Sequence, residues 1–122
     1  AIFYRYTLQL TLEAGEQMKQ KHDVDVEVID LRTLAPLAPD TFLESVAKTS
    51  RAVIVHEDNR TLGIGAEVAA TIAEQAFDCL DAPILRVTAP DVPLLPAAAE
   101  LEKFCTVSAD KIVAALERSM AY

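Results

Sequence analysis

Glycine is scarce in this sequence, with three residues among 122, at Gly15, Gly63 and Gly65. Only the run Gly63-Ile64-Gly65 could belong to a glycine-rich phosphate loop, because it lies between an expected strand and an expected helix. The dinucleotide fingerprint needs a third glycine where Val68 stands, and the Lys-Ser or Lys-Thr pair of a P-loop is missing. We interpret these glycines as positions of a tight turn and close packing, with phosphate binding as the alternative.

Cysteine and long apolar runs are also rare. Cys79 and Cys105 lack the spacing of a Cys-x-x-Cys redox motif or a zinc site, so we expect neither a disulfide framework nor a metal. No apolar run approaches the roughly 20 residues that cross a bilayer, and the start lacks the order of a secretory signal. These features predict a soluble, cytoplasmic protein. The abrupt start in β-prone residues predicts a fragment of a longer chain.

Basic residues are outnumbered by acidic ones. Lys and Arg total 11 against 19 Asp and Glu, which gives a net charge of −8. We therefore expect neither nucleic acid nor a membrane as a partner, because both are themselves anionic. A basic protein partner would suit this charge, although an acidic surface commonly serves only solubility.

Strand and helix patterns alternate along the chain. Short β-branched or apolar runs predict strands at residues 2–6, 24–31, 51–56 and 83–88. Helical periodicity predicts helices at about residues 8–18, 41–47, 65–80 and 108–120, and the prolines in 90–96 predict an extended connection. This alternation indicates a three-layer α/β/α sandwich with a mostly parallel, doubly wound sheet of about four to five strands.

Particular residues mark the ends and faces of the expected helices. Thr41 and Glu44 have the spacing of a capping box, and Ser108 is a good N-cap for the last helix. Because the helix after Gly65 is apolar over more than one stripe, it could pack on the sheet and also on another subunit. The expected buried stripes are Leu8, Leu12, Gly15 and Met18 in the first helix and Ile112, Val113, Leu116 and Met120 in the last.

The run His56-Glu57-Asp58 ends the third expected strand, where open α/β sheets usually place ligand contacts. An imidazole beside carboxylates could act as an acid or a base. The sequence offers no nucleophile motif to complete such a site, such as Gly-x-Ser-x-Gly. We therefore expect no catalytic residue in this chain, and we interpret His56 and Glu57 as buried polar or interface residues.

Five separated segments resemble one family. Together they look like the carboxy-terminal domain of 2-oxoacid dehydrogenase E1 β subunits, within the transketolase superfamily. Residues 88–93 and the final helix also resemble the tail of that family. The segments are VEVIDLRTLAPL at 26–37, ESVxKT at 44–49, VHE at 55–57, GxGAE at 63–67 and DAPIxRV at 81–87.

The resemblance implies that residues 1–122 form one transketolase C-terminal-like domain of a longer E1 chain, either a β subunit or the β part of a fused E1. The parent enzyme would decarboxylate a 2-oxoacid oxidatively with thiamine diphosphate and Mg, and would transfer the acyl group to lipoyl-E2. The cofactor needs a Gly-Asp-Gly turn and a later Asn-Asn pair, and this sequence has neither. We expect both cofactors in the other domains of the parent enzyme.

The resemblance also implies two surfaces. One joins other E1 subunits in an α2β2 assembly, and the other receives the generally basic peripheral-subunit-binding domain of E2, through Asp91 and the carboxyl-terminal residue Tyr122. His56-Glu57 favours a branched-chain 2-oxoacid. A pyruvate- or acetoin-type E1, or a free-standing small-ligand or nucleotide-binding domain, is the alternative. The residues assigned to the subunit interface are His56, Glu57, Gly63, Gly65 and Glu67.

Overall fold

The computed structural model describes residues 1–92 and 98–122. Its four strands form a parallel sheet in the order β2-β1-β3-β4. The strands are β1 (Ile2–Phe3), β2 (Ile29–Asp30), β3 (Val53–Asn59) and β4 (Leu85–Ala89). The helices are α1 (Leu8–His22), α2 (Asp40–Thr49), α3 (Ile64–Gln75), α4 (Ala99–Cys105) and α5 (Ala109–Met120), and two 3-10 turns are η1 (Arg5–Thr7) and η2 (Phe77–Cys79).

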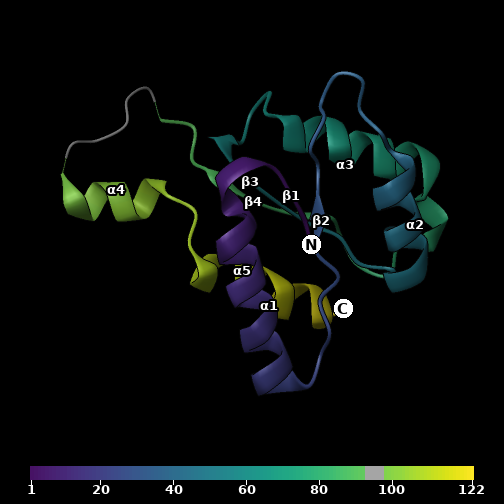
Figure 1. Ribbon diagram of the computed structural model, residues 1–122, viewed down its shortest axis with the longest axis horizontal. Coiled ribbons are helices and arrows are strands. Elements are labelled where there is room, and N and C mark those ends of the chain that lie inside the picture. Colours follow the sequence, from purple (N-terminus) through teal and green to yellow (C-terminus); the bar gives the residue numbers. More distant parts are fainter. Residues whose placement is uncertain (93–97) are drawn as a thin grey trace.

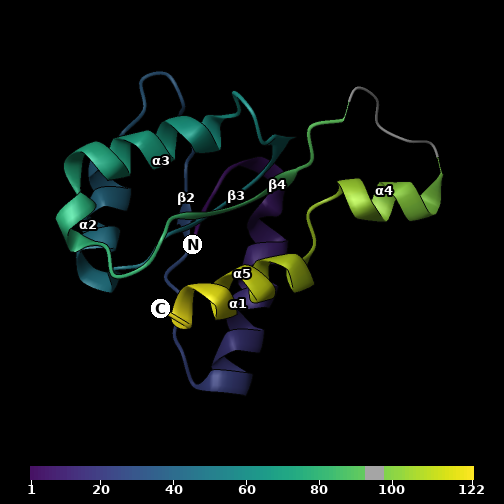
Figure 2. The same cartoon turned by 180° about the vertical axis from the view of Figure 1, so that it is seen from behind.

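Helices cover both faces of this sheet, so the predicted α/β fold is confirmed (Figures 1 and 2). Strand β3 explains the two cores, because its side chains alternate between the faces. Ile54 packs in a cluster with residues of α2 and α3, including Phe42, Val46, Val68 and Ile72. Val53 and Val55 pack in a second cluster with residues of α1 and α5, including Met18, Ile112 and Val113.

The strand order reverses between β1 and β3, and at such a point an open α/β sheet usually leaves a crevice at the carboxyl ends of the two strands. The chain itself fills part of the crevice, because η1 follows β1 directly and packs on β3. Thr7 is buried there, and its hydroxyl donates a hydrogen bond to the carbonyl oxygen of Tyr4 at 3.2 Å. The carboxyl edge of the sheet is therefore where loops gather.

Several predicted strand boundaries were wrong. The first strand ends at Phe3 because η1 begins two residues later, and the second forms ladder pairs only at Ile29 and Asp30. Strand β3 runs past His56 to Asn59, where it still pairs with Ala89 of β4. The third helix ends at Gln75, and η2 follows it. Helix α4 was not predicted, and residues 93–97 of the expected extended connection lie outside the described residues.

The predictions of helix ends and faces were mixed. Ser108 caps α5 as predicted, since its Oγ accepts a hydrogen bond from the Lys111 N–H at 3.4 Å. The capping box was wrong, because α2 begins at Asp40 without a side-chain cap. Helix α1 buries Thr11, Ala14 and Met18 and leaves Leu8 and Leu12 exposed, and α5 leaves Met120 exposed. Thr11 tolerates burial because its hydroxyl donates to the Thr7 carbonyl at 2.8 Å.

Candidate interaction site at the carboxyl edge of the sheet

A histidine joins the end of β3 to the start of α3. His56 is fully buried, and its Nε2 accepts a hydrogen bond from the backbone N–H of Gly65 at 3.2 Å. An accepting Nε2 means that the imidazole is neutral and carries its proton on Nδ1. Burial lowers the pKa of His56 below 6.5, while the Asp58 carboxylate raises that pKa and the Arg86 guanidinium lowers it by smaller amounts.

Both Gly63 and Gly65 must be glycine, because His56 and the Asn59 backbone leave no room for a Cβ. A Cβ on Gly65 would lie 2.3 Å from Nε2 of His56. A Cβ on Gly63 would lie 2.3 Å from the carbonyl oxygen of Asn59 and 2.8 Å from Cε1 of His56. Atoms of His56 and Asn59 thus pack directly against both glycines. The N–H of Gly65 and the N–H of Ala66, which donates to the Gly63 carbonyl at 2.9 Å, are already engaged. The structure supports close packing as the role of the glycines.

Hydrogen bonds also fix the other side of the loop. The Asp91 carboxylate accepts the backbone N–H of Thr61 at 2.9 Å and the Thr61 hydroxyl at 2.6 Å, and these bonds lower the pKa of Asp91. Arg60 Nη1 donates to the Arg86 carbonyl at 3.2 Å, and Arg86 Nη1 donates to the Arg60 carbonyl at 3.1 Å. The loop is therefore held to β4 on one side and to His56 on the other.

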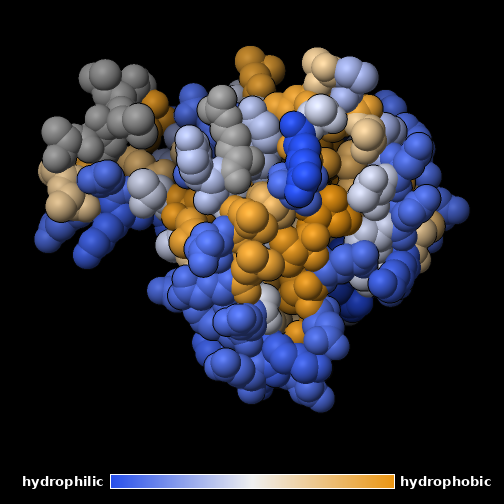
Figure 3. Space-filling view, in the orientation of Figure 1, coloured by the Kyte–Doolittle hydropathy of each residue, from blue (hydrophilic) through white to orange (hydrophobic). Residues whose placement is uncertain are grey.

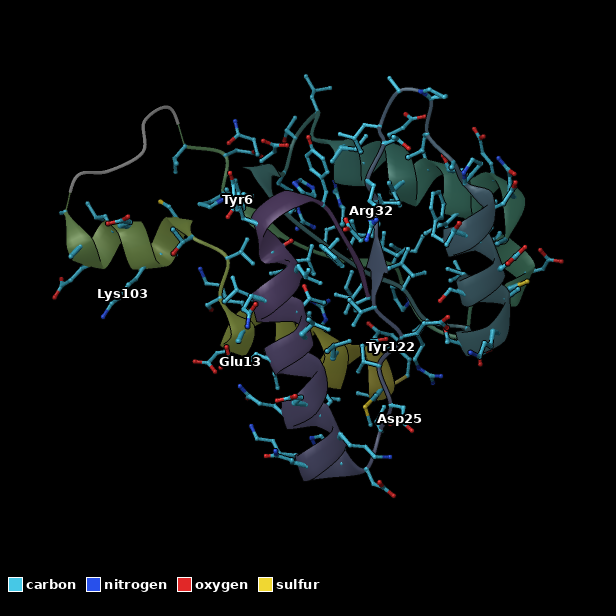
Figure 4. The ribbon with its side chains drawn as sticks, viewed as in Figure 1. Tyr6, Glu13, Asp25, Arg32, Lys103 and Tyr122 are labelled. Carbon is cyan, nitrogen blue, oxygen red and sulfur yellow. The ribbon has the colours of Figure 1, made fainter. Side chains whose placement is uncertain are left out.

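This anchored loop exposes an apolar side chain. Leu62 has φ 60°, a left-handed conformation that is unfavourable for leucine, and its residue surface is 96% exposed. Tyr6, in η1 at the same edge, is 83% exposed (Figure 4). A single exposed leucine is ordinary, but backbone strain gathers at functional sites, so the strained Leu62 makes this loop a candidate contact for a partner. One sequence signal for Leu62, its place as an apolar residue inside a polar turn, was missed.

The structure separates the residues that were assigned to the subunit interface. Glu57 and Glu67 are exposed at the carboxyl edge, whereas His56 and Gly65 are buried and can act only by shaping the loop. Gly63 is half-buried within that loop. A partner at this edge would therefore touch the carboxylates directly and the imidazole only indirectly.

The two residues assigned to E2 docking lie at opposite edges of the sheet. Asp91 follows β4 at the carboxyl edge, beside Thr61. Tyr122 follows α5, whose Ser119 carbonyl accepts a hydrogen bond from Arg51, a residue just before β3, at 3.1 Å. Tyr122 is therefore exposed near the amino edge, far from Tyr6 in Figure 4. One copy of the chain does not bring Asp91 and Tyr122 together.

A second apolar area lies beside α1 and over β2 in Figure 3, with hydrophilic residues around it. Strand β2 is an edge of the sheet, and Arg32 Nε lies 3.5 Å from the Asp30 carboxylate at its end. Charged residues at an open edge discourage strand pairing with another chain. Within residues 1–92 and 98–122 we find no helix that could span a membrane and no group of three potential metal ligands.

Residues 4–112 match the family described as transketolase, C-terminal domain. The chain belongs to this family. A solved structure titled split gene transketolase, inactive beta4 tetramer, has the same fold as this transketolase C-terminal domain, with a TM-score of 0.81 and 24% identity. That match covers 98% of this chain and 37% of the other.

Curated relatives of this transketolase C-terminal domain include E1 β subunits of two substrate types. The pyruvate dehydrogenase E1 component subunit beta of Rickettsia felis is 42% identical over 121 residues, which is 99% of this chain and 36% of that protein. The 3-methyl-2-oxobutanoate dehydrogenase subunit beta of Mycobacterium tuberculosis is 41% identical over 96% of this chain and 33% of that protein. The 2-oxoisovalerate dehydrogenase subunit beta of Bacillus subtilis is 38% identical over 94% of this chain and 35% of that protein. The chain thus spans about a third of the length of these relatives.

Two glycine-to-alanine changes test the packing of the loop. Gly65→Ala should lower the free energy of unfolding by about 1–3 kcal/mol, because the new methyl group overlaps the buried imidazole. Gly15→Ala is the matched control in α1, since its Cβ would meet Val26 Cβ at an ordinary 3.7 Å. This control should raise the free energy of unfolding by about 0.5–1 kcal/mol. Urea unfolding measures both, and equal effects of the two changes would contradict the proposed contact.

The stability should also depend on pH through His56. Its pKa in the folded chain lies below 6.5, so the unfolded chain takes up a proton first as the pH falls. The stabilisation is therefore complete above about pH 6.5 and is lost below it. Urea unfolding between about pH 7.5 and 5.5 should show this loss, and His56→Gln, which keeps an acceptor but does not titrate, should flatten the profile. Identical profiles for both proteins would refute the assignment.

Proposed function

We propose that this chain is the carboxy-terminal domain of a 2-oxoacid dehydrogenase E1 β module, and that it assembles E1 and docks E2 without holding the catalytic apparatus. The observation that carries the proposal is the match to E1 β subunits, with about 40% identity over nearly the whole chain. The parent enzyme would decarboxylate a 2-oxoacid and transfer the acyl group to lipoyl-E2. Its proposed compartment is the cytoplasm.

The proposed substrate class is a 2-oxoacid, with a branched-chain acid favoured. Support for the branched-chain type is the His56-Glu57 pair, together with relatives that are named for 3-methyl-2-oxobutanoate and 2-oxoisovalerate. A relative named for pyruvate is equally similar, at 42% identity. The buried position of His56 makes it a support for a loop, so it would not contact the substrate itself.

The residues described here do not fit thiamine diphosphate with Mg. His56 and the Asn59 carbonyl pack against the glycine loop. The N–H groups of Gly65 and Ala66, which a diphosphate would need, already donate hydrogen bonds within the chain. Within the described ranges, no three carboxylate, histidine or cysteine side chains gather as metal ligands. The proposal therefore assigns the cofactor and the metal to other domains of the parent enzyme. The same filled loop disfavours the alternative of a free-standing nucleotide-binding domain.

The two edges of the sheet suit two different partners. At the carboxyl edge, Leu62 and Tyr6 offer apolar contacts beside the carboxylates of Glu57 and Glu67, which suits another E1 subunit. The amino edge, with Tyr122, would receive the basic binding domain of E2. The relative whose title names a beta4 tetramer supports assembly as a property of such domains.

The first test is cofactor binding. The 122-residue chain should show no change in melting temperature with thiamine diphosphate and Mg, because the only glycine loop is occupied by its own atoms. Nucleotides and phosphorylated metabolites should have no effect either. Calorimetric titration with the same ligands is the confirming measurement. A saturable rise in melting temperature with any of them would show that the chain holds a ligand site, and the proposal would then fail.

The second test is docking to E2. The chain should bind the peripheral-subunit-binding domain of a branched-chain or pyruvate E2, and the affinity should fall as salt rises from about 0.05 to 0.5 M. Tyr122→Ala should weaken binding by about tenfold or more. Asp91→Asn should change it by less than about threefold, because Asp91 already accepts two hydrogen bonds from Thr61. Surface plasmon resonance measures these affinities, and absence of binding to both E2 types would overturn the docking role.

A further inference from the structure

A pocket of about 380 Å³ lies at the amino edge of the sheet, among α1, α2 and α5. The first residue of the chain and the last helix meet there, because both Ala1 and Met120 line the pocket. The N and C labels accordingly lie close together in Figures 1 and 2. A pocket of this volume is large enough for a small organic ligand. It is separate from the Leu62 loop, which lies at the carboxyl edge.

The walls of this pocket are mainly apolar. Their apolar side chains come from α1, from the segment before β2, from β3 and from α5, and they are Met18, Val24, Val26, Val53, Leu116 and Met120. The chain has two methionines, and both line this one pocket. Methionine side chains are flexible and polarisable, so they can adjust to apolar ligands of varied shape. The walls therefore suit an aliphatic chain.

Arg51 gives the pocket a cation that no carboxylate of the described residues neutralises. Its Nε donates a hydrogen bond to the Ser119 carbonyl at 3.1 Å, which holds the guanidinium between the start of β3 and the end of α5. None of the ion pairs within residues 1–92 and 98–122 includes Arg51. Its two Nη groups thus keep their donors, in the planar geometry that suits a carboxylate.

The acidic side chains of the lining already have partners of opposite charge. Asp25 lies 3.1 Å from Nζ of Lys19. Glu27 lies 3.5 Å from Nζ of Lys48. Among the described charged side chains of the lining, Arg51 is therefore the one without an opposite charge, and an anionic group would complement it.

Two further polar groups of the lining fit an anion better than a cation. Ser119 is 2% exposed, and its Oγ has no hydrogen-bond partner among the described residues. Buried hydroxyl groups nearly always have a partner, and a ligand oxygen would accept this hydrogen. The amino group of Ala1 donates to the Glu27 carbonyl, and burial lowers its pKa to about 6, so it adds a donor but little charge above about pH 7.

We propose that this pocket binds an aliphatic monocarboxylate. The carboxylate accepts hydrogen bonds from the Nη groups of Arg51 and from the Ser119 hydroxyl. The aliphatic tail packs against Met18, Leu116 and Met120. Fatty acids and branched 2-oxoacids share this chemistry. The site goes beyond the proposed E1 function, since it involves neither the cofactor nor a partner subunit.

NMR of methyl-labelled methionine tests the site directly, because both methionines of the chain line it. Hexanoate should shift the methyl signals of Met18 and Met120 in a saturable way and should raise the melting temperature. Acetate should bind at least about tenfold more weakly, because it leaves the apolar walls unfilled. Hexylamine should not bind, because its ammonium group would meet Arg51. A comparison of hexanoate with 3-methyl-2-oxobutanoate shows whether a fatty acid or a branched 2-oxoacid fits better.

Two variants separate the carboxylate contact from the apolar contact. Arg51→Gln should weaken hexanoate binding by about tenfold or more, because glutamine can still donate to the Ser119 carbonyl but carries no charge. Arg118→Gln is the matched control, since it removes the same charge from α5 outside the pocket, and it should change the affinity by less than about threefold. Met120→Trp, at a position that is 39% exposed, should obstruct the tail.

Circular dichroism and thermal melting check that each variant is folded. Three results would overturn the proposal: no methyl shift with either carboxylate, equal binding of hexylamine and hexanoate, or an unchanged affinity in a folded Arg51→Gln variant. Neither E2 nor thiamine diphosphate enters these measurements, so this test can fail independently of the proposed function.

Discussion

The arrangement of the carboxyl edge depends on one hydrogen bond, from the Gly65 N–H to Nε2 of the buried His56. The start of a helix leaves backbone N–H groups without partners, and α3 has no side-chain cap at Gly63 to satisfy one. The imidazole from β3 does this instead, and in doing so it fixes the helix to the strand. The bond requires a neutral ring, which burial favours, and it leaves no room for a Cβ on Gly65.

The same bond removes one N–H donor that the loop could otherwise offer to an anion. A Gly-x-Gly turn at the start of a helix normally offers its N–H groups to an anion. Here the strand has filled that position with an uncharged ring, so the loop becomes a rigid support. Hydrogen bonds from Thr61 to Asp91 complete the support on the β4 side. Leu62 lies between these two anchors, which explains how an exposed leucine is kept in a left-handed conformation.

The sequence predicted the fold well because apolar runs and helical periods alternate throughout the chain. It failed where tertiary contacts override local pattern. Thr11 is buried in place of Leu12, because its hydroxyl can bond to the Thr7 carbonyl, and periodicity alone does not register such a bond. Gly63, Gly65 and His56 were singled out from the sequence, but the contact between them was not predicted. His56 and Gly65 are nine residues apart, and the turn between them brings them together. The gathering of Arg60, Arg86, Lys111 and Arg118 beside β4 was not predictable, because these cations come from the loop after β3, from β4 and from α5, and the net charge of −8 conceals them.

A parallel sheet explains how such a small domain can offer separate surfaces. All carboxyl ends of its strands gather loops at one edge, and all amino ends lie at the other, so Leu62 and Tyr122 face different directions. Partners bound at these two edges would therefore contact different residues of the chain. Only the carboxyl edge is built on the His56 loop, so protonation of the imidazole would disturb that edge and leave the amino edge, where Tyr122 lies, unchanged.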